Sequence, residues 1–262
     1  MEKYSYRKAH RYKKKKPICS KRFLFLGTLS LIFIGGIFYL LFLSAVFQVE
    51  KIIVSGEKKV FKEEIEVLAE RRLENTVLFF KTKSIFAVDI NQIKEDILQS
   101  FPQIAEAELG RDFFNAISIV VSERTAVALW CQDKECFLID KQGVIFEEVS
   151  AEADLLKIEG KRVEPFLTLG LAVIEPEELL QIFEVRTKLI EIADISVNKA
   201  VIVSQERLDV KTIEGWEIYF NPKRDLDWQI RELALVLEKQ ISSEKRRTLE
   251  YVDLRFSRVY YK

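Results

Sequence analysis

FLFLGTLSLIFIGGIFYLLFLSAVF, residues 23–47, is the stretch that decides how this chain is organised. It contains no charged residue and is dominated by Phe, Leu and Ile. At about 1.5 Å per residue, a helix of this length exceeds the ~30 Å hydrocarbon core of a bilayer, so the stretch predicts one transmembrane helix over residues 23–47. A cleaved signal peptide is the alternative, but its apolar region spans only about 7–15 residues, and Ser44-Ala45-Val46 is a poor cleavage site.

The residues before the apolar stretch are strongly basic. Residues 1–22 hold ten Lys and Arg against the single acid Glu2, whereas the whole chain balances 41 basic against 41 acidic residues. Basic flanks resist translocation, so we expect residues 1–22 to be a cytoplasmic tail of a single-pass, type II protein of the cell (inner) membrane. A lysine run is also typical of nucleic-acid binding, but directly before an apolar span it is more economically a topology signal. We therefore expect a membrane-embedded protein with no nucleic-acid partner.

Residues 48–125 predict a small two-layer domain. Residues 49–54 are rich in β-branched side chains and precede a turn at Ser55-Gly56, which favours a strand. A second helix is expected to begin after Asp89 as N-cap and to end before Pro102. Alternation of apolar and polar residues over 105–109 and 117–121 indicates two strands. The first helix is indicated by an apolar stripe at helical spacing: Phe61, Ile65, Leu68, Ala69 and Leu73. The order is β-α-α-β-β, with two helices on one face of a three-stranded sheet.

Residues 126–262 predict a mainly antiparallel β domain with two helices. Glu175-Pro176 opens the first helix, which runs to about residue 192, because Pro is favoured at the first helical position. A second apolar stripe predicts a helix over about 225–241, and alternation predicts one long final strand over 248–261. The other strands are expected at 127–131, 136–140, 144–146, 200–203, 208–213 and 216–220. The fold class is therefore α+β.

The residues that could carry chemistry are few. The only histidine, His10, lies in the basic tail, so the predicted outer domains have no histidine base or histidine metal ligand. We find no Cys-x-x-Cys pair, phosphate-binding glycine loop or dinucleotide motif, and we expect no metal and no cofactor. Carboxylates are plentiful, but they alternate with apolar residues as solvated faces do. We therefore predict no catalytic residues and no enzyme activity.

Cys131 and Cys136 flank a four-residue turn. Paired strands would set them opposite one another, within reach of a disulfide, and oxidation is plausible outside the membrane. Two buried free thiols are the alternative, while a zinc site would need two further ligands that the sequence lacks. The third cysteine, Cys19, would be a reduced thiol in the cytoplasmic tail.

Four stretches together resemble the FtsQ/DivIB family of bacterial cell division proteins. They are Phe47–Gly56 directly after the span, Val120–Arg124 between the two domains, Leu138–Phe146, and Tyr251–Phe256 near the end. Each is weak alone, but their order and spacing are fairly specific. The resemblance covers nearly the whole chain and implies a membrane-proximal POTRA domain followed by a β domain. Thr125 departs from the pattern, because the family commonly has Pro there.

The resemblance also implies a role and partners. Family members are non-catalytic scaffolds that recruit division proteins at the septum, and their C-terminal strand is an exposed sheet edge that accepts a strand from FtsB (DivIC), itself paired with FtsL. The matching positions here are Tyr251, Arg255, Phe256, Ser257 and Arg258. The alternative is that Phe256 belongs to the core and that the charges only protect a sticky edge. The POTRA domain is implied to meet the septal peptidoglycan synthase and upstream division proteins.

Two other functions compete with the scaffold. A membrane-anchored cell-wall hydrolase would need a cleft with paired carboxylates. A POTRA-type transport accessory subunit would be expected to continue into many alternating barrel strands, a pattern that this sequence does not show.

Overall fold

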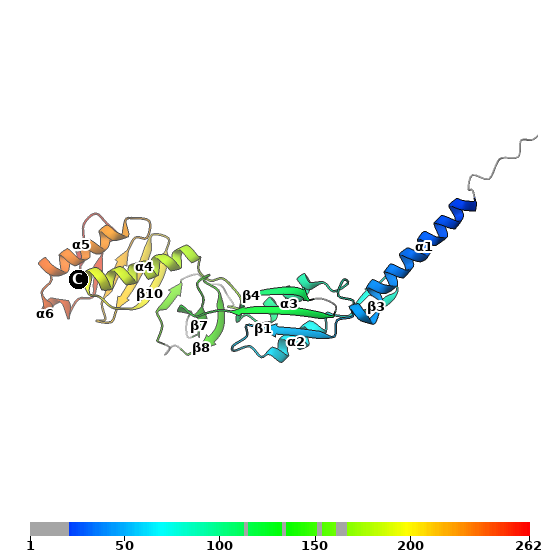
Figure 1. Ribbon diagram of the computed structural model, residues 1–262. Coiled ribbons are helices and arrows are strands. Elements are labelled where there is room, and N and C mark those ends of the chain that lie inside the picture. Colours follow the sequence, from blue (N-terminus) through cyan, green and yellow to red (C-terminus); the bar gives the residue numbers. More distant parts are fainter. Residues whose placement is uncertain (1–20, 113–114, 133–134, 151–153, 161–166) are drawn as a thin grey trace, which may run out of the picture.

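The computed structural model describes residues 21–262 except 113–114, 133–134, 151–153 and 161–166. The molecule is elongated, with one long helix projecting from one end and the C terminus at the other (Figure 1). Of the predicted basic tail, only Lys21 and Arg22 belong to the described residues; His10 and Cys19 lie outside them.

The projecting helix α1 spans Lys21–Phe42, and its stretch Phe23–Phe42 is long and apolar enough to cross a membrane. Its 20 residues correspond to about 30 Å of helix, the thickness of a bilayer core. The helix ends five residues before the predicted limit, and a short 3₁₀ turn, η1 (Ala45–Phe47), follows. The cause is local capping: the Gln48 side chain donates to the Phe42 carbonyl at 3.1 Å, and the Ser44 hydroxyl accepts from the Val46 N–H at 3.4 Å.

The membrane-proximal domain, elements β1 to β5, has the predicted order of main elements. They are β1 (Lys51–Ser55), α2 (Lys62–Glu70), α3 (Ile90–Ser100), β4 (Ile104–Asp112) and β5 (Ala116–Glu123). The three-stranded sheet has the order β1-β5-β4, with β1 parallel and β4 antiparallel to β5. Asp89 caps α3 as predicted, because its Oδ1 accepts the N–H groups of Asn91 and Gln92 at 3.0 and 3.2 Å. The core includes the fully buried Ile65, Ile93, Ile97, Ile117 and Ile119.

The membrane-proximal domain also contains an additional hairpin between its two helices. It consists of β2 (Asn75–Val77) and β3 (Phe80–Thr82), which pair only with each other within the described residues. Figure 1 shows β3 beside the last turns of α1. The sequence pattern did not predict this hairpin, because apolar residues run through it without alternation.

Gly56 makes the turn after β1 possible. Its φ is +91°, and a Cβ there would lie 2.1 Å from the Val121 carbonyl oxygen on β5. Only glycine tolerates both conditions, so the predicted Ser55-Gly56 turn brings β1 against β5 at close range.

The C-terminal domain, elements β6 to β14, is built on one sheet of nine strands. The sheet order is β14-β13-β12-β11-β10-β9-β6-β7-β8. The strands are β6 (Ala128–Gln132), β7 (Glu135–Ile139), β8 (Ile145–Val149), β9 (Lys157–Gly160), β10 (Val197–Ser204), β11 (Arg207–Thr212), β12 (Glu217–Phe220), β13 (Tyr251–Asp253) and β14 (Tyr260–Tyr261). The unpredicted β9 pairs in parallel with both β6 and β10 and so joins the two halves into one sheet. The α+β class, with a mostly antiparallel second domain, is confirmed.

Two long helices pack on one face of this sheet. They are α4 (Pro176–Ala193), which begins at Pro176 as predicted, and α5 (Leu226–Lys239), capped by Asp225; a short helix, α6 (Ser243–Arg246), follows. Their buried faces meet inward side chains of the strands in one core, whose largest buried members include Trp216 and Phe220. In the described part of the chain, no helix covers the opposite face of strands β11 to β14.

The prediction of one long strand over 248–261 is wrong. The chain forms two short strands, β13 and β14, which pair antiparallel with each other. The interruption has a local cause: Asp253 Oδ1 accepts the Arg255 N–H at 3.1 Å, an Asx turn that competes with the sheet for this amide. As a result β13 lies inside the sheet, between β12 and β14, and β14 forms the edge.

Candidate partner-binding surface

The C-terminal edge of the sheet presents unpaired backbone groups. Lys262 and Tyr251 exchange both backbone hydrogen bonds, at 3.1 and 3.3 Å. The next pair, Tyr261 opposite Val252, is therefore of the non-hydrogen-bonded type. It follows that the Tyr261 N–H and C=O point away from β13, toward the outside of the sheet. No strand among the described residues pairs on that side.

The five predicted contact residues fall into two groups. Tyr251 and Arg255 are half-buried, whereas Phe256, Ser257 and Arg258 are exposed in the loop that leads into β14. Phe256 is 52% exposed and packs edge-on against Tyr260, with ring centroids 6.1 Å apart. It does not belong to the core, so that alternative for Phe256 is wrong. The structure thus exposes three of the five residues beside the edge, while Tyr251 lies one strand inside it, on β13.

An aromatic and charged row crosses the helix-free face behind this edge. Asp209, Tyr219, Asp253 and Tyr260 lie side by side on β11, β12, β13 and β14. The Tyr219 and Tyr251 rings stack with centroids 5.3 Å apart. The guanidinium carbons of Arg207 and Arg255 lie 4.5 and 5.6 Å from the centre of the Tyr219 ring. Sequence reasoning missed Arg207 and Tyr219, because nothing in the sequence shows that β11 and β12 lie next to the C-terminal strands.

Bidentate ion pairs hold the arginines of this row. Arg255 donates Nε and Nη2 to the Asp253 carboxylate at 2.9 and 2.6 Å, and Arg207 makes the same fork to Asp209 at 2.7 and 2.9 Å. These hydrogen bonds raise the pKa of both guanidinium groups above the ordinary value. Both therefore keep their charge, and the bidentate pairs fix the orientation of the two side chains.

Tyr219 is held as a neutral phenol. Burial, together with the hydrogen bond from its hydroxyl to Glu217 Oε2 at 3.0 Å, raises the pKa of Tyr219 to about 12. At physiological pH the hydroxyl is thus protonated and donates to Glu217. Such pre-organised aromatic and arginine side chains are typical of interface hot spots.

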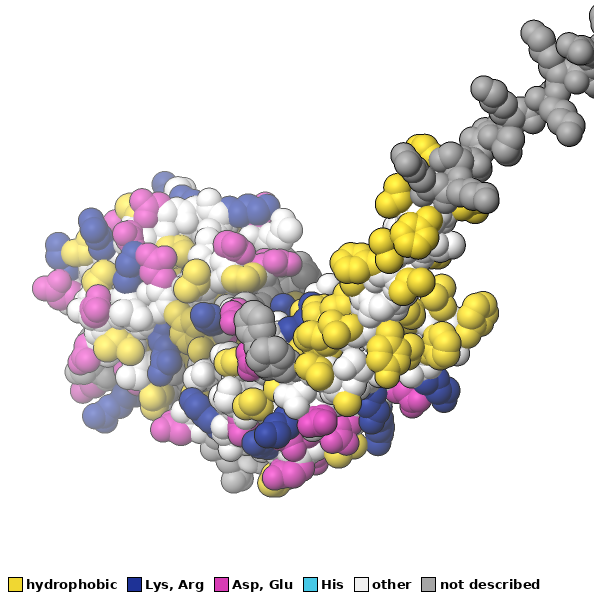
Figure 2. Space-filling view, turned by 45° about the vertical axis from the view of Figure 1, so that its right-hand side comes forward, with side chains coloured by type: hydrophobic (Ala, Val, Ile, Leu, Met, Phe, Trp, Pro, Cys, Tyr) yellow, Lys and Arg dark blue, Asp and Glu magenta, His cyan; other side chains and the backbone are white. Residues whose placement is uncertain are grey.

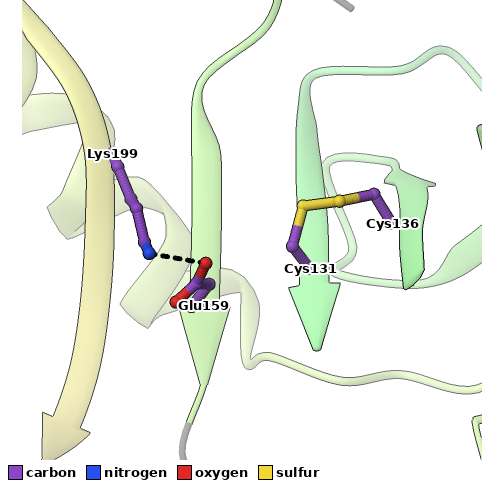
Figure 3. The surroundings of a disulfide bond; sticks show 4 residues. All are labelled: Cys131, Cys136, Glu159 and Lys199. Atoms are coloured by element: carbon purple, nitrogen blue, oxygen red, sulfur yellow. Dashed lines mark ion pairs between the residues drawn. A yellow bond between two sulfur atoms is a disulfide. The ribbon is translucent and has the colours of Figure 1, made fainter. Parts of the chain in front are cut away.

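The Cys131–Cys136 hairpin lies at the other half of the sheet. The two residues are directly opposite one another on β6 and β7, and their sulfurs are bonded (Figure 3). The neighbouring strands carry the ion pair between Lys199 and Glu159, at 2.6 Å. The cysteines pack in a small apolar cluster on the face opposite α4, away from the C-terminal edge.

Acidic side chains line cavities among the described residues. A pocket of about 340 Å³ between α4 and the β10–β11 hairpin has Glu178 as its single acidic side chain. A pocket of about 260 Å³ at the domain junction contains Glu106, Glu123 and Asp140, but backbone N–H groups or an arginine engage the last two carboxylates. No group of three or more His, Cys, Asp or Glu that could hold a metal occurs in the described part of the chain.

Comparison with protein families assigns both outer domains. Residues 47–124 match the POTRA domain of FtsQ type, and residues 128–255 match the C-terminal domain of the cell division protein FtsQ/DivIB. The chain belongs to the FtsQ/DivIB family. The matches fall on β1 to β5 and on β6 to the start of the loop before β14, so the membrane-proximal domain is a POTRA domain.

Curated relatives carry the same names. The chain is similar to the cell division protein DivIB of Clostridium acetobutylicum, with 31% identity over 44% of this chain and 43% of the relative. It is also similar to DivIB of Clostridium tetani, with 23% identity over 80% and 78% of the two chains. FtsQ of Rickettsia typhi matches with 27% identity over 44% of this chain and 40% of its own length. Two of these three FtsQ/DivIB relatives are thus matched over less than half their length.

Two side chains of the junction stretch, Glu123 and Arg124, have structural roles here. Glu123, at the end of β5, accepts the N–H groups of Lys58, Lys59 and Val60 at 2.7, 2.7 and 3.0 Å through one carboxylate oxygen. Partial burial raises the pKa of Glu123. The three hydrogen bonds together lower it by more, so the net pKa is below the ordinary value. Glu123 therefore acts as an anionic cap that fixes the loop before α2.

Arg124 joins the POTRA domain to the C-terminal domain. Its Nε donates to the Pro102 carbonyl at 3.0 Å, while its Nη1 pairs with the buried Asp140 carboxylate. The other oxygen of Asp140 accepts the N–H groups of Gln142 and Val144, both at 3.0 Å. A second interdomain ion pair, Lys59 to Glu147 at 3.0 Å, lies nearby on the surface. The spacing of these stretches in the sequence alone does not show that Arg124 and Asp140 meet.

Proposed function

We propose that this chain is a non-catalytic scaffold of the bacterial divisome that recruits and links division proteins at the septum. Its membership of a cell division family supports this role. We further propose that α1 anchors it in the cell membrane with the N terminus in the cytoplasm. The basic residues that precede the apolar helix support this orientation, since basic flanks stay on the cytoplasmic side.

The proposed partner is the FtsB/FtsL pair, bound by strand addition at the C-terminal edge. The observation that carries this proposal is the outward-facing N–H and C=O of Tyr261 on β14, the last strand of the sheet. A partner strand would gain main-chain hydrogen bonds there, and the adjoining side chains would select it. Phe256, Ser257 and Arg258 would contact the partner directly, while Tyr251 and Arg255 would position the edge from the row behind it.

The POTRA domain is proposed as a second, separate contact surface for the septal peptidoglycan synthase and upstream division proteins. Its position between α1 and the C-terminal domain supports this, because it is the folded part nearest to the span (Figure 1).

Substitution of Tyr261 tests strand addition by removing one hydrogen bond, the one that its outward N–H would donate to a partner strand. Tyr261→Pro removes the outward N–H but none of the hydrogen bonds between β13 and β14, because Pro lacks only its own N–H. Tyr261→Ala removes the same side chain and keeps the N–H, so it is the matched control. We expect Tyr261→Pro to bind FtsB/FtsL about tenfold more weakly than Tyr261→Ala, as one lost hydrogen bond predicts. The measurement is affinity by titration, with co-purification from cells as a second readout.

Equal affinities of the Pro and Ala variants would refute strand addition at this edge. Deletion of residues 251–262 is a poor substitute for this test, because Val252 and Leu254 are buried in the main core. Their removal would destabilise the whole domain, so loss of binding would have two explanations. Deletion of residues 259–262 reduces this problem, because Val259 and Tyr261 are only partly buried at the margin of that core.

A further inference from the structure

The tip of the β2–β3 hairpin is an exposed apolar patch on the POTRA domain. Three consecutive residues form it: Leu78, Phe79 and Phe80 are 70%, 92% and 51% exposed. Within the described residues the hairpin pairs with no other strand. Soluble surfaces rarely expose such a run of large apolar side chains, so this patch, which we call the hairpin tip, requires a partner.

The backbone of the hairpin tip supports a role for these side chains. Leu78 has a φ of +58°, one of two non-glycine residues with positive φ in the described chain. Asn or Gly would occupy this left-handed position at lower cost in free energy. Leucine at this position lowers the stability of the folded hairpin somewhat, but it places a large apolar side chain at the tip.

Hydrogen bonds fasten the base of the hairpin to the end of α1. The buried Thr82 hydroxyl donates to the Phe42 carbonyl at 2.5 Å, and the buried Ser84 hydroxyl donates to the Leu41 carbonyl at 2.7 Å. Gln48 connects the two sides: its Oε1 accepts the Lys83 N–H at 2.8 Å, and its Nε2 donates to Thr82 Oγ1 at 3.2 Å. The hairpin therefore has a fixed position next to the last turn of the apolar helix.

This position places β3 directly next to the end of α1. Figure 1 shows β3 running beside the last turns of α1. Figure 2 shows hydrophobic side chains continuing from the helix onto the part of the molecule at its base, with Lys and Arg side chains close below them. Lys81 and Lys83, both exposed, follow the tip in sequence. Basic side chains beside an apolar patch are typical of an interfacial anchor, with the patch in the acyl boundary and the amines at the phosphates.

We propose that the hairpin tip inserts into the outer leaflet of the same bilayer that α1 spans, as a second membrane contact of the POTRA domain. This inference rests on the proposed membrane anchor. Two attachment points, the span and the tip, would restrict the tilt of the POTRA domain relative to the membrane plane. The lipid surface is favoured over a protein partner because hydrogen bonds fasten the base of the hairpin to the end of α1, the helix proposed to enter the bilayer.

A fluorescent probe at the tip tests this proposal in the full-length protein. Phe79→Cys, in a Cys19→Ser background, would be labelled with an environment-sensitive dye and reconstituted into phosphatidylglycerol/phosphatidylethanolamine vesicles. Phe61→Cys is the matched control, because Phe61 is a similarly exposed phenylalanine, 68%, on the same domain. It is the N-cap residue of α2 and follows the loop that Glu123 fixes, whose Lys59 pairs with Glu147 of the C-terminal domain.

We expect blue-shifted emission from the probe at position 79 and several-fold stronger quenching by nitroxide-labelled lipid than at position 61. Leu78→Asp should move the emission toward the control value, while the probe at position 61 remains unchanged. Equal emission and quenching at the two positions would overturn the proposal. A blue shift that disappears when the protein is diluted with more lipid would also overturn it, because the tip would then contact a second copy of the protein rather than lipid. Vesicle flotation reports the anchor separately: a floating protein with an unquenched tip contradicts only this inference.

Discussion

Single side chains at the domain junction connect parts of the chain that are far apart in sequence. Glu123 caps the loop of residues 58–60, and Arg124 pairs with Asp140 across the two domains. Asp140 is buried, so removal of the arginine would leave a buried charge without its cation, which typically costs several kcal/mol. These two consecutive residues thus fix both the POTRA domain and its attachment to the C-terminal domain.

Glu123 gives the stability a defined dependence on pH. Its folded-state pKa lies below its unfolded value, so the stability it supplies is complete above the unfolded pKa, about 4.5, and is lost as pH falls through the folded pKa. Glu123→Gln should destabilise the protein by about 1 kcal/mol at neutral pH, because a neutral amide accepts weaker hydrogen bonds. Below the folded pKa the difference should vanish. Urea unfolding at several pH values measures it, and a pH-independent difference would contradict this role.

At the scale of the elements, the β6–β7 hairpin carries the disulfide-bonded cysteines Cys131 and Cys136. Their register across the strands agrees with the position expected from the four-residue turn between them. Because the loop they close is short, chain-entropy arguments give the disulfide only about 2 kcal/mol of stabilisation.

We predict that Cys131 and Cys136 are oxidised in protein purified from membranes without reductant. Alkylation before and after reduction, followed by mass spectrometry, checks this: both cysteines should be labelled only after reduction, whereas Cys19 should be labelled throughout. Labelling of all three without reduction would show that the pair consists of free thiols. Cys131→Ala/Cys136→Ala should still fold, since the surrounding core remains.

Other elements show where sequence reasoning succeeds and where it fails. The buried positions Ile65 and Ala69 of α2 and the Asp89 cap of α3 were predictable, because helical spacing and capping are local properties. Phe61 was wrongly placed on the buried stripe: it is the exposed N-cap residue of α2. The β9 strand and the β2–β3 hairpin were missed, since neither alternates clearly. The final strand was predicted too long. The alternation of apolar and polar residues does not reveal that the Asp253 side chain accepts the Arg255 N–H and so interrupts the strand. The edge itself was correctly expected near the C terminus, but β13 is covered and β14 forms it.

At the scale of the whole molecule, the apolar helix α1 and the C-terminal edge of the sheet lie far apart. The C terminus and β14 lie at the end of the elongated molecule opposite to α1 (Figure 1). A partner anchored in the same bilayer would therefore have to extend past the POTRA domain to reach the edge. The interdomain pair of Arg124 and Asp140 would help to hold that edge at a fixed distance.

Amide hydrogen exchange at β14 tests the central claim, strand addition at the C-terminal edge, most directly. In the free protein, the outward Tyr261 amide should exchange quickly, while the Lys262 amide, bonded to the Tyr251 carbonyl at 3.1 Å, should exchange more slowly. On addition of FtsB/FtsL, we predict strong new protection of the Tyr261 amide. Full binding of the pair with the Tyr261 amide still exchanging as in the free protein would contradict the account.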